Sequence, residues 1–233
     1  MSGKTIDIKT GPMSGPGMTG YLAMPASGKG PGLLVVQEIF GVNSHIREVA
    51  DLYAAAGFVA LAPDAFWRLE KNVELGYTPA DMQKGMALAK QLDQGQAMAD
   101  FQSAIETLKA VPGCGGKVGV VGYCFGGTVA YKLATSDRVE AAVGYYGGGI
   151  EAALGSAGNL HCPLMLHFGE KDAHISMASV DKIKAALKDS GHVEVYTYDA
   201  DHGFNCDQRA SYDRKSAMLA YGRSYAFLKN ALT

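Results

Sequence analysis

The sequence predicts an α/β protein in which helices flank a mostly parallel β-sheet. Two observations lead to this fold class: continuous apolar runs bounded by turn residues, typical of buried parallel strands, and intervening stretches with apolar residues three or four apart, typical of helices. These segments alternate along the chain, as in strand–helix–strand units. Buried strands are predicted at residues 33–36, 58–62, 118–121, 141–146 and 164–168.

The same patterns place the other elements. Helical spacing of apolar residues covers 46–56, 97–108, 180–187 and 218–228. Residues 193–198 alternate with polar partners and are expected near a sheet edge, while 5–8 and 21–24 suggest an N-terminal hairpin. Residues 67–79 carry the sole tryptophan and no periodicity, so they form either a binding loop or an ordinary surface excursion.

Composition predicts one globular domain over residues 1–233. The chain is 48% hydrophobic and 19% charged, without a repeat or a low-complexity linker. No apolar run approaches the roughly 20 residues that a membrane span needs. Residues 1–17 lack the apolar core of a secretion signal, so we expect a cytoplasmic protein. A net charge of −2 provides no basic footprint for nucleic acid.

The cysteines and the charge balance limit the possible partners. Four cysteines without a CxxC pair or a His/Cys ligand spacing predict neither a disulfide framework nor a metal site. We expect no cofactor. We expect no nucleic-acid partner and no membrane partner, and the protein is expected to be a monomer or a small homo-oligomer.

The strongest motif lies between an apolar strand and a helical stretch. Cys124 is the centre of the run Gly122-Tyr123-Cys124-Phe125-Gly126, which is a nucleophile-elbow pattern with cysteine in place of serine. A side chain on such a sharp turn needs flanking glycines to avoid a clash, and the following helix N-terminus favours a thiolate. The alternative is a buried core cysteine, which would not require both glycines.

A thiol nucleophile needs a base and a group that orients the base. Asp172 and His202 each follow a predicted strand, and the carboxyl ends of parallel strands meet at one edge of a sheet. Cys124, Asp172 and His202 are therefore expected to converge. Glu170 and Asp201 are rival acids, although either fits a solvated turn residue. The other histidines fit a helix face, a strand interior or a loop equally well: His45, His161, His167, His174 and His192.

With these residues, the sequence resembles the dienelactone hydrolase family, also called carboxymethylenebutenolidases, which are cysteine hydrolases of α/β-hydrolase fold. The resemblance spans nearly the whole chain. It rests on Gln37-Glu38-Ile39-Phe40-Gly41-Val42-Asn43, Ala62-Pro63-Asp64, the elbow with Gly127, Val143-Gly144-Tyr145-Tyr146-Gly147, Asp172 and Asp201-His202-Gly203-Phe204. It implies an α/β-hydrolase fold without a large cap domain, and a carboxylic-ester hydrolase that cleaves an enol-lactone or related ester through a thioester on Cys124.

The resemblance also implies roles that spacing does not reveal. It makes Glu38 a neighbour of the resting nucleophile that helps to activate the thiol when substrate binds; the alternative is a strand-end glutamate that faces solvent. In such a fold the oxyanion hole consists of the backbone N–H groups of Ile39 and Phe125. Phe40 is a further expected substrate contact.

The chain departs from the family where well-known members hold a substrate carboxylate with two arginines. Lys84 takes the place of the first arginine and Cys206 that of the second. Lysine neutralises a carboxylate only as a flexible point charge. Arg209 either compensates or is a surface residue.

Two classes of function remain open. The first is a hydrolase, acting on a dienelactone-type enol-lactone or, alternatively, on small esters or thioesters in general. The second is a non-catalytic sensor or ligand-binding protein that uses a reactive cysteine on the same fold. The complete set of Cys124, Asp172 and His202 favours the hydrolase.

Overall fold

The computed structural model describes residues 3–10 and 17–233. The chain divides into two compact units, Met1–Gly119 and Val120–Thr233, and each is described by itself. The single domain expected from composition stays a prediction. Residues 1–2 and 11–16, which belong to the stretch that we compared with a secretion signal, lie outside the described residues.

Four strands form the sheet of the first unit in the order β1-β2-β4-β3. The predicted N-terminal hairpin is confirmed, because β1 (Lys4–Ile8) pairs antiparallel with β2 (Met18–Ala23). β2 also pairs antiparallel with β4 (Val59–Pro63), and β4 pairs parallel with β3 (Gly30–Val36). The predicted buried strands therefore occur here, with an antiparallel hairpin added at one side.

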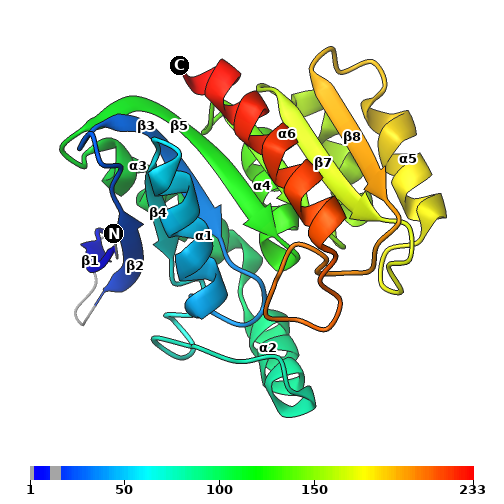
Figure 1. Ribbon diagram of the computed structural model, residues 1–233, viewed down its shortest axis with the longest axis horizontal. Coiled ribbons are helices and arrows are strands. Elements are labelled where there is room, and N and C mark those ends of the chain that lie inside the picture. The colour runs from blue at the N-terminus through cyan, green and yellow to red at the C-terminus, as the bar shows by residue number, and fades with distance from the viewer. Residues whose placement is uncertain (1–2, 11–16) are drawn as a thin grey trace. The chain divides into compact units, whose positions relative to one another are not determined.

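Two predicted helices pack on these strands. α1 (Ser44–Ala55) lies against β3 and β4, as Figure 1 shows, and begins at Asn43, whose side chain accepts the Ile46 N–H. α3 (Gln94–Lys109) packs on the same two strands and begins at Asp93. Both start at side chains that satisfy helix-terminal amides, as N-caps do.

One helix of the first unit was not predicted. α2 (Pro79–Gln91) has only Gly85 and Leu88 buried, so it shows no apolar stripe. Its start is nevertheless marked in the sequence, because Thr78 and Asp81 form a capping box around a proline at the first helical position.

The second unit has a parallel sheet. β6 (Ala141–Tyr145) pairs with β7 (Leu164–Gly169), and β7 pairs with β8 (Val193–Tyr198), which is the last strand in the order and confirms the expected edge position. β5 (Cys114–Tyr123) begins in the first unit and ends in the second. It starts four residues before the prediction, because its glycine-rich, largely exposed beginning lacks an apolar run.

The helices of the second unit follow the predictions closely. α4 (Phe125–Ala134) packs on β6, and α6 (Arg214–Leu232) packs on β6 and β7 (Figure 1). α5 (Met177–Leu187) contacts a 3-10 segment, η1 (Glu151–Asn159), which was not predicted. Among the residues that the structure describes, no helix combines the length and the apolar character that crossing a membrane requires.

Candidate active site

Cys124 occupies a strained turn between β5 and α4. Its φ of 54° and ψ of −111° lie outside the regions that side chains ordinarily adopt. A Cβ at Gly122 would collide with the carbonyl oxygen of Gly126, so the first glycine of the motif is sterically required. The local geometry is therefore the elbow that the sequence predicted, with the side chain at the N-terminus of a helix.

Asp172 and His202 form a buried pair in the second unit. Asp172 follows β7, and its Oδ2 lies 2.7 Å from Nδ1 of His202, which follows β8. The other carboxylate oxygen accepts the backbone N–H groups of His174 (2.8 Å) and Ile175 (3.1 Å). Burial raises the pKa of Asp172, but the hydrogen bonds to His202 and to these amides outweigh burial and lower it overall. The carboxylate is thus ionised and fixed.

The rival acids do not orient the histidine ring. Glu170 is exposed and accepts the hydroxyl of Thr197 (2.7 Å). Asp201 is exposed and accepts the backbone N–H of His202 (2.6 Å). Of the three acids considered, Asp172 alone has a contact with the imidazole.

His202 connects the acid to Cys124. A carboxylate can only accept, so Nδ1 of His202 donates to Asp172 and leaves Nε2 as the ring nitrogen for the sulfur. Burial lowers the pKa of His202, but hydrogen bonds with Asp172 and Cys124, together with their charges, raise it to about 10. The structure thus brings Cys124, Asp172 and His202 together as the sequence predicted.

His174 is a neighbour that sequence reasoning did not single out. Its exposed ring packs edge-to-face against the His202 ring, with centroids 5.2 Å apart. Its position two residues after Asp172 was the only available signal.

The candidate residues of the first unit follow β3. Glu38 and Phe40 are each 1% exposed, so the interpretation of Glu38 as a solvent-facing strand-end residue is wrong. The Phe40 ring packs against Tyr77 at 4.7 Å. A Cβ at Gly85 would collide with the carbonyl oxygen of Ile39, so this glycine lets α2 approach the segment closely.

The backbone from 37 to 43 is tied to the loop that follows β4. The side chain of Gln37 accepts the Ala65 N–H (3.1 Å), and the carbonyl of Phe40 accepts the Leu75 N–H (2.9 Å). The side-chain amide of Asn43 donates to the carbonyl of Leu75 (2.9 Å). Two side chains and one carbonyl of the segment that carries Glu38 therefore hold it to the backbone of the loop.

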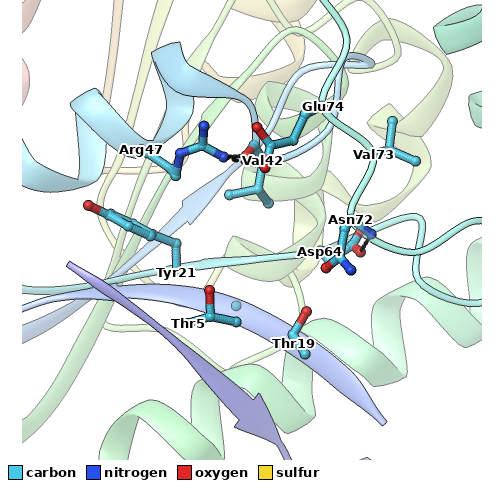
Figure 2. Close-up of a pocket in the computed structure, with 10 residues that line it drawn as sticks. Thr5, Thr19, Tyr21, Val42, Arg47, Asp64, Asn72, Val73 and Glu74 are labelled. Atoms are coloured by element: carbon cyan, nitrogen blue, oxygen red, sulfur yellow. Dashed lines mark hydrogen bonds and ion pairs between the residues drawn. The ribbon is translucent and has the colours of Figure 1, made fainter. Parts of the chain in front are cut away.

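Figure 2 shows how further polar side chains hold the same loop around a cavity of about 60 Å³. Arg47 donates to the carbonyl of Val42 (2.8 Å) and forms an ion pair with Glu74 (2.7 Å). Asp64, the last residue of the Ala-Pro-Asp motif, accepts the Asn72 N–H (2.9 Å). These contacts hold the loop in place at Asn72 and at Glu74.

The loop with the sole tryptophan, residues 67–79, is buried at some positions and exposed at others, and its role as a binding loop stays a prediction. Trp67 is 5% exposed and Val73 is buried, whereas residues 68–72 are exposed. Buried Asp100 accepts the indole N–H of Trp67 (2.9 Å) and two guanidinium bonds from Arg68 (2.7 and 2.8 Å). The loop is thus pinned to α3 at its beginning.

The two candidate anion anchors have different surroundings. Lys84 forms an ion pair with Glu70 at 2.7 Å, and both side chains are about half exposed, at 46% and 47%. The Arg209 guanidinium lies against Gly203, where a Cβ would collide with it. Gly203 follows His202 and has a φ of 77°. Arg209 therefore lies near the catalytic histidine candidate, and Lys84 is neutralised by a neighbour.

A cysteine on a strand-to-helix elbow, an aspartate after one parallel strand and a histidine after the next define an α/β-hydrolase. Residues 18–232 match the model of the dienelactone hydrolase family. The chain belongs to this family, and it is a carboxylic-ester hydrolase.

Individual relatives agree with this assignment. A Synechocystis protein is 37% identical over 93% of this chain and 95% of its own length. A carboxymethylenebutenolidase of Pseudomonas sp. is 34% identical over 97% of this chain and 94% of its own length. A crystal structure from Klebsiella pneumoniae matches with a TM-score of 0.83 and 29% identity, covering 97% of this chain and 98% of that one. The predicted fold class is confirmed.

Proposed function

We propose that this enzyme hydrolyses an enol-lactone, or a related ester, with Cys124 as the nucleophile and a thioester as the acyl-enzyme. The observation that carries the proposal is the contact of His202 with both Asp172 and Cys124 at the strained elbow. Relatives named carboxymethylenebutenolidase support a lactone of that type as substrate.

Acylation uses the charge pair of Cys124 and His202. The sulfur attacks the acyl carbon, the bond from that carbon to the ester oxygen breaks, and the leaving oxygen takes a proton from Nε2 of His202. In a lactone the leaving oxygen is an enolate of the same molecule, so the ring opens and the product stays attached through sulfur. Asp172 stabilises the imidazolium and holds its orientation.

Deacylation reverses the role of the histidine. Acylation removes the charge from the sulfur, and with it one of the causes that raise the pKa of His202. The neutral ring then accepts a proton from water as that water attacks the thioester. The C–S bond breaks, the carboxylic acid leaves, and the sulfur regains its charge while His202 stays protonated.

Four further residues complete the proposed active site. The backbone N–H of Phe125, the first residue of α4, and that of Ile39 stabilise the negative oxygen of the tetrahedral intermediate. Glu38, a buried carboxylate, helps to activate the thiol, as the family resemblance implies. Phe40 belongs to the same segment and is the proposed apolar substrate contact.

Arg209 is the better candidate for holding a substrate carboxylate. Its guanidinium lies against the residue that follows His202, and its planar fork suits a carboxylate. Lys84 is the weaker candidate because Glu70 already pairs with it.

The enzyme is further proposed to act as a single domain in the cytoplasm, on a small molecule and without a nucleic-acid or membrane partner, as a monomer or small homo-oligomer. A sensor on the same fold is the second class of function. Turnover of p-nitrophenyl acetate and of a dienelactone, measured for the parent protein and for Cys124→Ala, separates the two. The proposal expects turnover that vanishes in the variant; no turnover in the parent, or undiminished turnover in the variant, contradicts it.

A further inference from the structure

A chain of polar side chains crosses the core of the second unit. The Nη1 of Arg223 donates to the hydroxyl of Tyr198 (3.0 Å), which lies 2.8 Å from Nδ1 of His167. The Nε2 of His167 lies 2.9 Å from the hydroxyl of Ser224, and that hydroxyl lies 2.7 Å from the hydroxyl of Tyr145. His167, Ser224 and Tyr145 are fully buried.

The groups of this chain complement one another as donors and acceptors. Burial and the charge of Arg223 lower the pKa of His167 to about 3, so its ring is neutral and has one donor and one acceptor nitrogen. Arg223 can only donate, so the hydroxyl of Tyr198 accepts from it. The His167 ring donates to one of its two hydroxyl neighbours, Tyr198 or Ser224, and accepts from the other.

The chain ends on the strand that supports the elbow. The backbone carbonyl of Tyr145 accepts the N–H of Cys124 at 3.0 Å. The ring of Tyr145 stacks on Tyr123, the residue before Cys124, with centroids 4.7 Å apart. A displacement of Tyr145 would therefore move the elbow through two contacts, one with the backbone of Cys124 and one with the ring of Tyr123.

Tyr146, the residue that follows β6, connects His167 to the His202 side of the site. The N–H of Tyr146 donates to the carbonyl of His167 at 2.7 Å, and Tyr146 has a positive φ of 39°. Its buried ring lies 5.0 Å from the His202 ring. The end of β6 thus lies against both members of the sulfur–imidazole pair.

Strained backbone persists only where the surroundings determine it, and Cys124 and Tyr146 are both strained next to this chain of hydrogen bonds. We propose that His167, Ser224 and Tyr145 are positioning residues, which hold the end of β6 so that the sulfur of Cys124 meets the imidazole of His202. This inference rests on the proposed role of Cys124. An apolar core would fill the same space but would not fix the rotation of the Tyr145 side chain.

The test compares Ser224→Ala and Tyr145→Phe with a matched control. Tyr131→Phe makes the same chemical change at another fully buried tyrosine of the second unit. For each protein we would measure p-nitrophenyl acetate turnover, the rate of iodoacetamide alkylation of Cys124, and the melting temperature. Alkylation reports on the sulfur itself and does not require turnover.

Both network variants are expected to lower kcat and the alkylation rate by about tenfold, with KM changed by less than about twofold, because small displacements of reacting groups are costly. Tyr131→Phe should change neither rate by more than about twofold. Ser224→Thr, which restores a hydroxyl, should recover most of the loss.

The inference is overturned if Ser224→Ala and Tyr145→Phe keep both rates, as Tyr131→Phe does, whatever they do to the melting temperature. Tyr145→Phe alone decides the matter if Ser224→Ala does not fold. Failure of the proposed function has a different signature, because Cys124→Ala would then retain turnover, while alkylation of Cys124 would still report on its positioning.

Discussion

The two units hold their candidate residues in different ways. In the second unit, Asp172 and His202 are joined through their side chains, and the polar chain from Arg223 to Tyr145 adjoins them. In the first unit, the segment that carries Glu38 is joined to the backbone of the loop after β4, chiefly through the side chains of Gln37 and Asn43. The proposed chemistry of the second unit thus depends on a buried polar core, whereas the placement of Glu38 depends on a loop, and loops are where related enzymes vary most freely.

Removal of His202, in the second unit, should have the largest effect on turnover. His202→Ala is expected to lower kcat by about 10³-fold or more, because the acid of the acylation step and the base of the deacylation step are lost together. Steady-state turnover of p-nitrophenyl acetate measures this. The double variant with Cys124→Ala should be scarcely worse than Cys124→Ala alone, and additive losses would show that the two residues act separately.

Thiol labelling should separate Cys124 from the other cysteines by about 100-fold in rate, since reactivity follows thiolate character and access. Burial raises the pKa of Cys162 to about 12, and Cys206 is fully buried. Limiting iodoacetamide followed by peptide mass analysis measures the order of labelling. Earlier labelling of Cys114, Cys162 or Cys206, with activity retained, would contradict the nucleophile assignment.

In the first unit, Asp100→Asn should lower the free energy of unfolding by about 2 kcal/mol, because it removes the charged acceptor shared by Trp67 and Arg68. Urea unfolding followed by tryptophan fluorescence measures the change. The matched control is Lys84→Ala, which breaks the exposed pair with Glu70 and should cost less than about 1 kcal/mol. Equal losses would mean that the loop is not pinned at Asp100.

The two candidate anion anchors, Arg209 in the second unit and Lys84 in the first, should differ in their effect on an anionic substrate. Arg209→Ala should lower kcat/KM for an anionic lactone by about tenfold, roughly 1.4 kcal/mol, and leave a neutral nitrophenyl ester almost unchanged. Lys84→Ala should have little effect on either substrate, because Glu70 already pairs with Lys84. Equal losses on both substrates would indicate a disturbed fold, and no loss would leave a neutral-ester or thioester hydrolase.

The pH dependence of stability tests the protonation of His202 in the folded state. The folded-state pKa of His202 is raised to about 10 from an ordinary 6.5, so the folded protein binds more protons between these values. The contribution of His202 to the stability of the folded protein is complete below pH 6.5 and is lost as the pH rises through 10. Between these values the free energy of unfolding falls by at most about 1.4 kcal/mol per pH unit. Urea unfolding at pH 6 and pH 9 should show a smaller difference for His202→Asn than for the parent; an unchanged difference contradicts the assignment.

The sequence was most informative where chemistry and local sterics coincide. The run around Cys124 identified the elbow because only glycine fits at Gly122, next to the carbonyl of Gly126. Buried strands and amphipathic helices were predicted because burial imposes periodicity. α2 was not predicted because it is mostly exposed, although its capping box can be recognised in the sequence.

By itself, the sequence determined the fold class, the order of the buried strands and amphipathic helices in the chain, and the candidate residues Cys124 and His202. Only the tertiary structure decided which acid contacts the imidazole, that Glu38 is buried, and that Arg209 lies against Gly203 while Lys84 is paired with Glu70. Local motifs depend on backbone geometry within a few residues, which neighbouring residues dictate. The contacts of Asp172 with His202 and of His167 with Ser224 join residues 30 and 57 positions apart, and no local pattern encodes such distances.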